Sequence, residues 1–345
     1  MKLTNEQIKA VATGVSYVSI TNEGRLVLHR FSSAEEDAYR ELKPNFFSKV
    51  LCSSGIRLAF RTDSSTVSLK GILKSGTSRS YASLEVFKDK RLVGAYDNYS
   101  HMTLPKQYTE LPCDLGELEC SFSLGDGEGL VEIYLPWSVR LELDFISLDD
   151  GASLTPVKRD KLLLAYGDSI TQGYDALKVS RRYSSRLAEL LGADEHNKAI
   201  GGEIFFPSLA RSADRSLEPD FITVAYGTND WCSRRSLELF RQEVREFFEG
   251  IRAAYPDVPI FALMPIWRKD EREFKPSKLK LGSLEGLTEL IRESTAHIPS
   301  LYVIHGYDAV PHSEDYFADL VLHPNDEGYS YQARAFYDRI KSYIK

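Results

Sequence analysis

The chain has 345 residues, of which 43% are hydrophobic and 27% are charged, and it carries a net charge of −7. This balance is typical of a folded globular protein and excludes a disordered chain. Because no basic stripe offsets the negative charge, the sequence argues against a nucleic-acid partner. The length exceeds that of one ordinary domain, so we expect two domains.

The N-terminus gives no sign of a targeting segment. Its first residues, MKLTNEQIKA, lack the apolar core of a secretory signal, and no run approaches the ~18 apolar residues of a membrane span. We therefore expect no membrane partner and a cytoplasmic location, which a leader ahead of the given sequence would reverse. A short helix is predicted to start near Thr4, and the four cysteines show no spacing typical of a metal site.

The residues up to about Asp150 have the pattern of an antiparallel β-structure. Short segments rich in β-branched and aromatic residues alternate with clusters of turn residues. Examples are Ile56–Phe60, Ala82–Phe87 and Gly129–Leu135. Several short strands at regular spacing predict a β-sandwich, or jelly roll, over residues 1–156.

Beyond Pro156, apolar runs alternate with stretches of helical periodicity. The apolar runs are Lys161–Tyr166, Phe221–Tyr226, Pro259–Leu263 and Leu301–Ile304, with a weaker one near Glu195–Ile200. The helical stretches are Ser180–Leu191, Arg235–Ala254, Leu284–Ile298 and Asn325–Ile344. Strands buried on both faces by crossover helices form a parallel sheet, so we expect an α/β domain over residues 157–345.

The strongest signal of chemistry is the segment LAYGDSITQG, Leu164–Gly173. A buried strand is expected to end at Tyr166, Gly167 permits a tight turn, and Ser169 follows at the carboxyl edge of the sheet. Ligands of open α/β sheets bind at that edge. Ser169 is therefore a candidate nucleophile.

A second signal, LHPNDEG, lies near the C-terminus. His323 is followed by Pro324, which restrains the backbone, and by Asn325 or Asp326 as the N-cap of a final helix. Such a turn fixes the imidazole at the end of the sheet. That is what a general base needs if it is to take a proton from Ser169 across ~2.6–3.2 Å.

Two further segments offer hydrogen-bond donors at the same edge. Asn229 in YGTNDW follows a buried strand, and its amide either caps a loop or donates to an oxyanion. The segment AIGGE, Ala199–Glu203, is either a plain turn or a place where a glycine N–H approaches a ligand.

Taken in order, Gly-Asp-Ser, the glycine turn, Gly-Thr-Asn-Asp and His-Pro-Asn resemble the four blocks of the SGNH (GDSL-like) hydrolase superfamily. The resemblance covers about Lys161 to Lys345. It implies a three-layer α/β/α, flavodoxin-like domain with a central five-stranded parallel sheet, and catalysis without a metal or cofactor. Carried over, Ser169 is the nucleophile and an oxyanion donor, and His323 is the base. Asn229 gives its amide, and Gly202 gives its N–H because Gly-Gly-Glu resembles the family's Gly-Asp step.

One position departs from the family pattern, which has an aspartate three residues before the histidine. Leu320 occupies that place here, and Asp319 lies one residue further away. A one-residue bulge would bring Asp319 to His323. Asp315, Asp308 or a backbone carbonyl are the alternatives for orienting the imidazole.

The substrate is indicated by the arrangement of the two domains. A jelly-roll module ahead of an SGNH domain resembles certain carbohydrate acetylesterases, so we expect hydrolysis of acetyl or other short acyl esters of a carbohydrate or other hydroxylated small molecule. The alternatives are a thioesterase or lysophospholipase, and a non-catalytic carbohydrate-binding protein. The N-terminal module could bind sugar, form one wall of the active site or support a homo-oligomer.

Three aromatic residues near the motifs are candidates for substrate contact. They are Tyr174, Trp231 and Trp267. Each either shapes the acyl pocket or packs in the core. If Trp231 closes the pocket, the acyl group is small.

Overall fold

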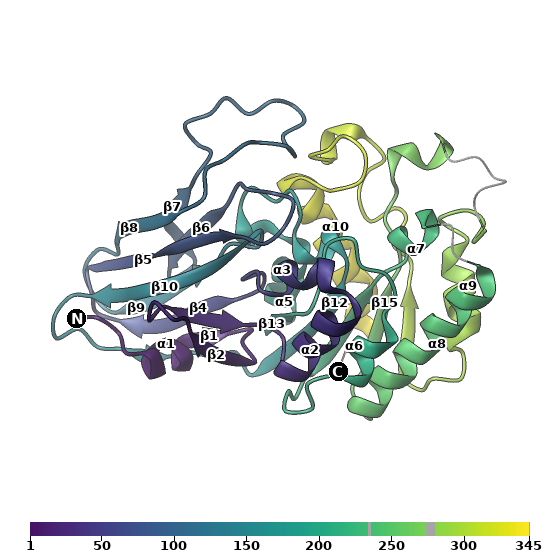
Figure 1. The fold of residues 1–345 in the computed structure, drawn as a ribbon, viewed down its shortest axis with the longest axis horizontal. Coiled ribbons are helices and arrows are strands. Elements are labelled where there is room, and N and C mark those ends of the chain that lie inside the picture. Colours follow the sequence, from purple (N-terminus) through teal and green to yellow (C-terminus); the bar gives the residue numbers. More distant parts are fainter. Residues whose placement is uncertain (234–235, 274–279, 345) are drawn as a thin grey trace.

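The computed structural model describes residues 1–233, 236–273 and 280–344. Two antiparallel sheets of the N-terminal part lie beside a parallel sheet that helices cover on both faces (Figure 1). This arrangement confirms the predicted fold class, an antiparallel sandwich ahead of an α/β/α unit. Within the described ranges, every helix is too short or too polar to pass through a lipid bilayer.

The N-terminal sheets pack face to face around one apolar core. The first sheet runs in the order β1 (Ala12–Thr13), β4 (Arg57–Thr62), β9 (Gly129–Tyr134), β6 (Ser83–Lys88) and β7 (Arg91–Asp97), with β11 (Thr155–Pro156) also paired to β4. The second runs in the order β2 (Tyr17–Ile20), β3 (Leu26–His29), β10 (Val139–Leu148), β5 (Thr66–Ser75) and β8 (Glu117–Ser123). Alternate residues of β5, namely Val67, Leu69 and Leu73, are buried in the core between the sheets, as the period of a strand requires.

The parallel sheet has the flavodoxin-like strand order. It runs β13 (Ala193–Asn197), β12 (Lys161–Gly167), β14 (Phe221–Ala225), β15 (Ile260–Leu263) and β16 (Leu301–Ile304). In such sheets the carboxyl ends of the strands next to the point where the order reverses form the ligand crevice. Here these are the ends of β12 and β14.

Helices bury both faces of this sheet. Phe247 of α8 (Leu237–Ala254) and Ile291 of α9 (Leu287–Thr295) share one apolar cluster with Leu164 of β12. Leu187 of α5 (Tyr183–Leu191) and Phe336 of α10 (Asp326–Ile340) share another with Leu163. Successive residues of β12 thus face opposite layers. Three shorter helices complete this part: α4 (Ser169–Gln172), α6 (Pro207–Arg211) and α7 (Thr228–Cys232).

The helices predicted from periodicity are present with shorter bounds. Arg235, the expected start of the stretch that forms α8, lies outside the described residues. Helix α1 (Asn5–Val11) begins after Thr4, whose hydroxyl and the Gln7 side chain form a reciprocal capping box. Short 3-10 helices lie at Pro44–Phe46, Val179–Arg181, Lys269–Glu273, Glu314–Tyr316 and Lys341–Tyr343.

The N-terminal half also holds helices that the sequence pattern did not predict. These are α2 (Ser33–Leu42) and α3 (Phe47–Val50). They lie in a segment, residues 31–50, that we call the strap, and Figure 1 shows it against the parallel sheet. Its residues Phe31, Tyr39 and Val50 belong to the apolar cluster of the α/β part. We propose the division of the chain into residues 1–156 and 157–345, with the strap packed on the second unit.

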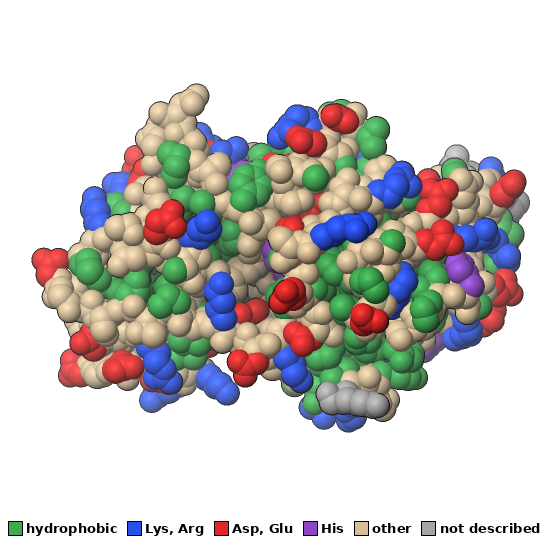
Figure 2. Space-filling view, turned by 90° about the horizontal axis from the view of Figure 1, so that it is seen from below, with side chains coloured by type: hydrophobic (Ala, Val, Ile, Leu, Met, Phe, Trp, Pro, Cys, Tyr) green, Lys and Arg blue, Asp and Glu red, His purple; other side chains and the backbone are tan. Residues whose placement is uncertain are grey.

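A buried arginine joins the two parts. Arg30 is fully buried and donates to the carbonyl oxygens of Asn197 and Ala199 at 3.0 and 2.8 Å, and to that of Cys52 at 2.9 Å. Hydrogen bonds satisfy the guanidinium across the boundary, so the strap is held in a defined position against the end of β13. On the outer surface, acidic and basic side chains are interspersed, as Figure 2 shows for one face.

Candidate active site

The turn after β12 places Ser169 at the first position of α4. A Cβ on Gly167 would lie 2.2 Å from Thr171 Oγ1, so only glycine fits where the strand meets the helix. The Asp168 carboxylate accepts from the Ile170 N–H at 3.0 Å and caps the first turn. Ser169 thus sits at the carboxyl edge of the sheet with its own N–H at a helix N-terminus, where backbone donors point outward.

His323 reaches Ser169 from the loop before α10. The Ser169 Oγ and the His323 Nε2 lie 2.8 Å apart, although 154 positions separate the two residues. The Ala318 N–H donates to the His323 carbonyl at 2.8 Å, and the Asn325 side chain caps α10 by accepting from two N–H groups of its first turn. The loop is therefore fixed on both sides of His323. The distance suits proton transfer from the hydroxyl to the imidazole.

Asp319 contacts the other nitrogen of the imidazole. Its Oδ2 lies 2.8 Å from His323 Nδ1, while its Oδ1 accepts from the N–H groups of Val321, Leu322 and His323 at 2.9, 2.7 and 3.0 Å. Leu320 has a φ of 62°, in the left-handed region that non-glycine residues rarely adopt. This conformation accommodates the extra residue of the Asp-x-x-x-His spacing. We propose Asp319 as the third member of a Ser-His-Asp triad.

The two other acids considered as partners of His323 contact different groups. Asp308 binds Arg339 at 2.9 Å, and Asp315 binds Lys106 at 3.2 Å. Both carboxylates are largely exposed.

Burial and hydrogen bonding set the charges of the triad. Burial acts to raise the pKa of Asp319, but the His323 hydrogen bond and charge and the backbone N–H groups outweigh it and lower that pKa to about 2. Burial acts to lower the pKa of His323, but the Asp319 hydrogen bond and the charges of Asp175 and Asp319 outweigh it, so the pKa lies above its ordinary value. Both shifts favour the imidazolium that forms when His323 takes a proton.

A second carboxylate, Asp175, lies beside the same imidazole nitrogen. Its Oδ2 is 3.4 Å from His323 Nδ1, and its side chain is fully buried. Arg79 contacts both carboxylate oxygens, with Nε 2.6 Å from Oδ1 and Nη2 3.2 Å from Oδ2, and the Tyr81 hydroxyl donates to Oδ1. The motif pattern did not point to Asp175, because Arg79 and Tyr81 lie 96 and 94 positions earlier in the chain.

The candidate oxyanion donors lie on neighbouring turns. The Gly201 N–H donates to the Gln172 side chain at 2.7 Å and is therefore engaged. Gly202 has a φ of +84°, and its N–H finds no acceptor among the described residues. The Asn229 amide donates to the Glu203 carbonyl at 2.9 Å, which orients it and leaves its second proton for a ligand. Gly202 and Asn229 thus remain the proposed donors, together with the N–H of the nucleophile.

The three aromatic candidates are placed differently. Tyr174 stacks on His323, with ring centroids 5.6 Å apart and planes inclined by 27°. Trp231 is 1% exposed, belongs to the apolar core and donates its indole N–H to a backbone carbonyl at 2.9 Å. Trp267 is half-buried and stacks on His312 at 5.1 Å. The structure therefore brings Tyr174 to the triad and gives Trp231 a packing position.

The strap supplies residues at the oxyanion turn that the sequence motifs did not indicate. Lys49 Nζ donates to the Gly201 carbonyl at 2.6 Å and lies 3.7 Å from the position of a Cβ on Gly202. Phe46 lies 3.6 Å from the same position. Burial lowers the pKa of Lys49. One wall beside the oxyanion turn thus comes from the N-terminal half.

The comparisons with known proteins agree with this geometry. Residues 165–331 match the sequence model of the GDSL-like Lipase/Acylhydrolase family. Residues 165–331 of the α/β part thus form a GDSL-like domain. It is accordingly an ester hydrolase of the SGNH type. No curated protein matches the chain by sequence.

Solved structures share the architecture of both parts. The salicylyl-acyltransferase SsfX3 from a tetracycline biosynthetic pathway superposes with a TM-score of 0.78 at 20% identity, over 97% of this chain and 96% of that chain. A family two carbohydrate esterase from Clostridium thermocellum, in complex with cellohexaose, has a TM-score of 0.63 at 17% identity, over 85% and 94%. An acetyl xylan esterase from the rumen bacterium Butyrivibrio proteoclasticus has a TM-score of 0.59 at 16% identity, over 86% and 92%. At these identities the likeness concerns the fold.

One group of side chains at the GDSL site has the composition of a metal site. The donor atoms of Asp175, Asp319 and His323 lie within 4.8 Å of one another. Arg79 and Tyr81 already bind the oxygens of Asp175, and both Asp319 oxygens accept hydrogen bonds. The oxygens of this group are thus already engaged with protein donors.

Proposed function

We propose that this protein is a serine esterase that hydrolyses short acyl esters, above all acetyl esters, of a carbohydrate or another hydroxylated small molecule. The proposal is supported first by the chain of contacts Ser169–His323–Asp319, in which both distances are 2.8 Å. A hydroxyl, a base and an orienting carboxylate in this order form the constellation of acyl transfer through a covalent intermediate.

The mechanism follows from these contacts. His323 Nε2 takes the proton of Ser169 Oγ as that oxygen attacks the ester carbonyl. The N–H groups of Ser169 and Gly202 and the amide of Asn229 stabilise the tetrahedral oxyanion, each contributing ~2.7–4 kcal/mol. The imidazolium then gives its proton to the leaving alcohol. Water attacks the acyl-enzyme by the same path and restores the free serine.

The nucleophile is shielded, since Ser169 is only 6% exposed. We expect a small acyl group to reach it more readily than a long one. A lysophospholipase or long-chain thioesterase activity is the weaker candidate, because the similar structures with this two-part layout include carbohydrate esterases.

The N-terminal half supports a carbohydrate as the alcohol part of the ester. Lys49 of the strap contacts the oxyanion turn, and Arg79 of the sandwich binds Asp175 next to His323, so both segments of the N-terminal half border the active site. Two of the similar structures with this layout are carbohydrate esterases, one of them named as an acetyl xylan esterase. The alternative of a non-catalytic binding protein is disfavoured by the contacts of His323 with Ser169 and Asp319.

A direct test compares esters that differ in one part at a time. We expect turnover of p-nitrophenyl acetate that falls from acetate to butyrate to octanoate, and release of acetate from acetylated xylo- or cello-oligosaccharides. Ser169→Ala is the control and should be inactive. Preference for octanoate or for coenzyme A thioesters would overturn the proposed substrate class, and equal rates for wild type and Ser169→Ala would overturn the proposed chemistry. Because another alcohol attacks the acyl-enzyme as water does, transfer of acetyl to an added sugar should be measured alongside.

A further inference from the structure

The imidazole of His323 faces two carboxylates at one nitrogen. Asp319 belongs to the same loop and makes the shorter contact, 2.8 Å to Nδ1. Asp175 belongs to the turn after the nucleophile and lies 3.4 Å from the same atom. A Ser-His-Asp triad uses one such group. The second is therefore unexplained by the proposed mechanism.

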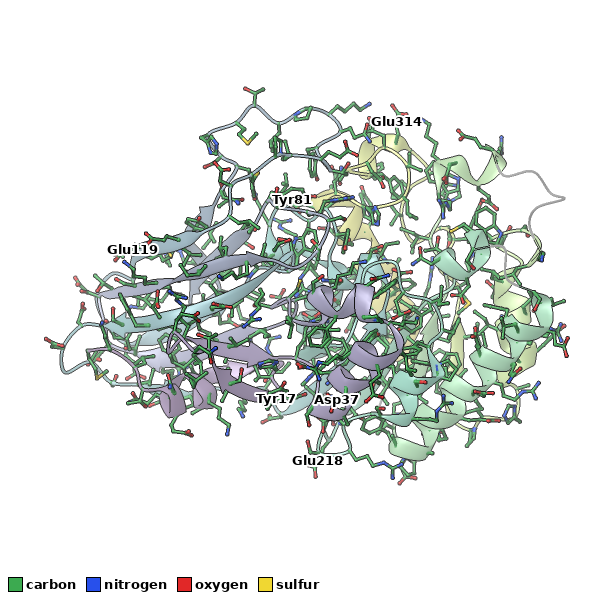
Figure 3. All side chains as sticks on the ribbon, in the orientation of Figure 1. Tyr17, Asp37, Tyr81, Glu119, Glu218 and Glu314 are labelled. Atoms are coloured by element: carbon green, nitrogen blue, oxygen red, sulfur yellow. The ribbon has the colours of Figure 1, made fainter. Side chains whose placement is uncertain are left out.

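Asp175 is held in place by the N-terminal half. Arg79 lies in the loop between β5 and β6, and Tyr81 lies just before β6. Figure 3 labels Tyr81 at the end of the sandwich that faces the C-terminal part. The Tyr108 hydroxyl also donates to the Asp175 backbone carbonyl at 3.1 Å. Asp175 itself has a φ of 69°, a conformation that aspartate and asparagine tolerate better than most residues.

The charges of these groups balance when His323 is protonated. With neutral His323, Asp319 and Asp175 contribute two negative charges and Arg79 one positive charge. Taking the proton from Ser169 brings this set to neutrality. Without Asp175, the imidazolium and Arg79 would face Asp319 alone. Without Arg79, two uncompensated carboxylates would face the imidazole and hold it protonated.

We propose that Asp175 is a positioning residue for the base His323, and that Arg79 of the sandwich sets how strongly Asp175 attracts the imidazolium. The proposal rests on the proposed role of His323 as the base. It gives the N-terminal module a function in the chemistry itself. The charge of Arg79, in the sandwich, acts on the base His323 through the carboxylate of Asp175.

The other groups that face His323 are the same in wild type and in variants of Asp175 and Arg79. The Asp168 carboxyl contributes a charge from the nucleophile turn, and burial raises its pKa to about 7. The Tyr174 ring covers the imidazole, and Ser169 occupies Nε2. Asp175 hydrogen-bonds none of these three side chains. Arg79 lies over the Tyr174 ring, with its guanidinium carbon 5.4 Å from the ring centroid, so Arg79→Lys, which keeps a cation at this position, is the control for that contact.

The first measurement is the titration of the His323 ring by NMR in histidine-labelled protein, assigned with His323→Gln. Asp175→Asn should lower the pKa of His323 by about one pH unit, and Arg79→Gln should raise it by a similar amount. Arg79→Lys, which keeps the charge and loses the forked contact, should stay close to wild type. Opposite directions for the two substitutions cannot come from loosened packing alone, which would move both variants alike.

The second measurement is the kinetics of p-nitrophenyl acetate hydrolysis. Asp175→Asn should lower kcat about tenfold, because about one pH unit of imidazolium stabilisation is lost. Its KM should change little, because Asp175 does not touch the substrate. Thermal unfolding of each variant checks that the fold is intact.

The outcomes separate the two proposals. A pKa of His323 that does not move in Asp175→Asn, or that moves in the same direction in both variants, overturns the role of Asp175 and Arg79. A wild-type protein that does not hydrolyse esters overturns the proposed function, while the NMR titration still decides the electrostatic coupling. Shifts of the His323 pKa in opposite directions in Asp175→Asn and Arg79→Gln, together with a lower kcat in Asp175→Asn, support the proposed coupling of Arg79, Asp175 and His323.

Discussion

Glu35 Oε2 and Lys198 Nζ form an ion pair at 2.5 Å, and neither side chain is exposed to solvent. Glu35 belongs to α2 of the strap, and Lys198 follows β13. The pair lies beneath the boundary between the two halves, near Arg30. Charges buried this deeply are stable only when they are paired.

Breaking this pair should destabilise the protein strongly. Glu35→Gln keeps the shape of the side chain and leaves the Lys198 ammonium without its counter-charge, which typically costs about 3–5 kcal/mol of unfolding free energy. Lys198→Met added to Glu35→Gln should recover most of the loss, because no buried charge remains. Urea unfolding measures both. The exposed pair of Glu289 and Arg292 is the matched control, and Glu289→Gln should have little effect. An equally small change in Glu35→Gln would contradict the structural role of the buried pair.

Loss of the Asn229 amide should affect the chemical step more than substrate binding. Asn229→Ala is expected to lower kcat by about 10²–10³, the usual effect of removing one oxyanion donor, with a small change in KM. Steady-state kinetics on p-nitrophenyl acetate checks this. Asn229→Asp is an informative companion, because it removes both amide protons and adds a charge that repels the oxyanion, so it should be at least as inactive. A kcat within twofold of wild type in both variants would remove Asn229 from the oxyanion site.

The dependence of activity on pH should report His323. Because its pKa lies above the ordinary value of about 6.5, the base is protonated at acidic pH, and kcat/KM should rise as the pH passes upward through that pKa. Asp319, with a pKa of about 2, stays ionised over the working range and adds no inflection. Asp319→Asn should lower kcat by about 10²–10⁴ and move the inflection to lower pH, because the charge that favours the imidazolium is gone.

Asp168 is the control for that assignment. Its pKa of about 7 lies in the same window, so its ionisation could produce a similar inflection. Asp168→Asn retains an oxygen that can cap α4, and it should leave the inflection in place. If the inflection disappears in Asp168→Asn, the titrating group is Asp168 and the assignment to His323 fails.

Two of the residues that the sequence placed at the site, Ser169 and His323, lie close to the end or the start of a regular element. Ser169 follows a buried strand, and His323 precedes a capped helix, so periodicity and turn chemistry locate them. The left-handed Leu320 is different. Its conformation decides whether Asp319 reaches His323, and no local pattern specifies it. The sequence therefore left several acids open.

The contacts between the two halves could not be predicted from the sequence for a related reason. Asp175 meets Arg79 and Tyr81 only through the packing of two folded units, and a single sequence carries no trace of such a pairing.

The helix α2, which the sequence pattern did not predict, does have a local signal. Ser32 and Glu35 form a capping box, and this Ser-x-x-Glu signal is visible in the sequence. This capping signal is short, and the segments on either side of it have the pattern of strands.

The most direct test of the account is the site of covalent labelling. A fluorophosphonate probe reacts with a serine that a neighbouring base activates, and mass spectrometry of the digested protein locates the adduct. We expect a single adduct on Ser169 in wild type, and at most slow labelling in His323→Gln. Wild-type protein that remains unlabelled, or that carries its adduct on a different serine, would contradict the claim that Ser169 and His323 form the reacting pair.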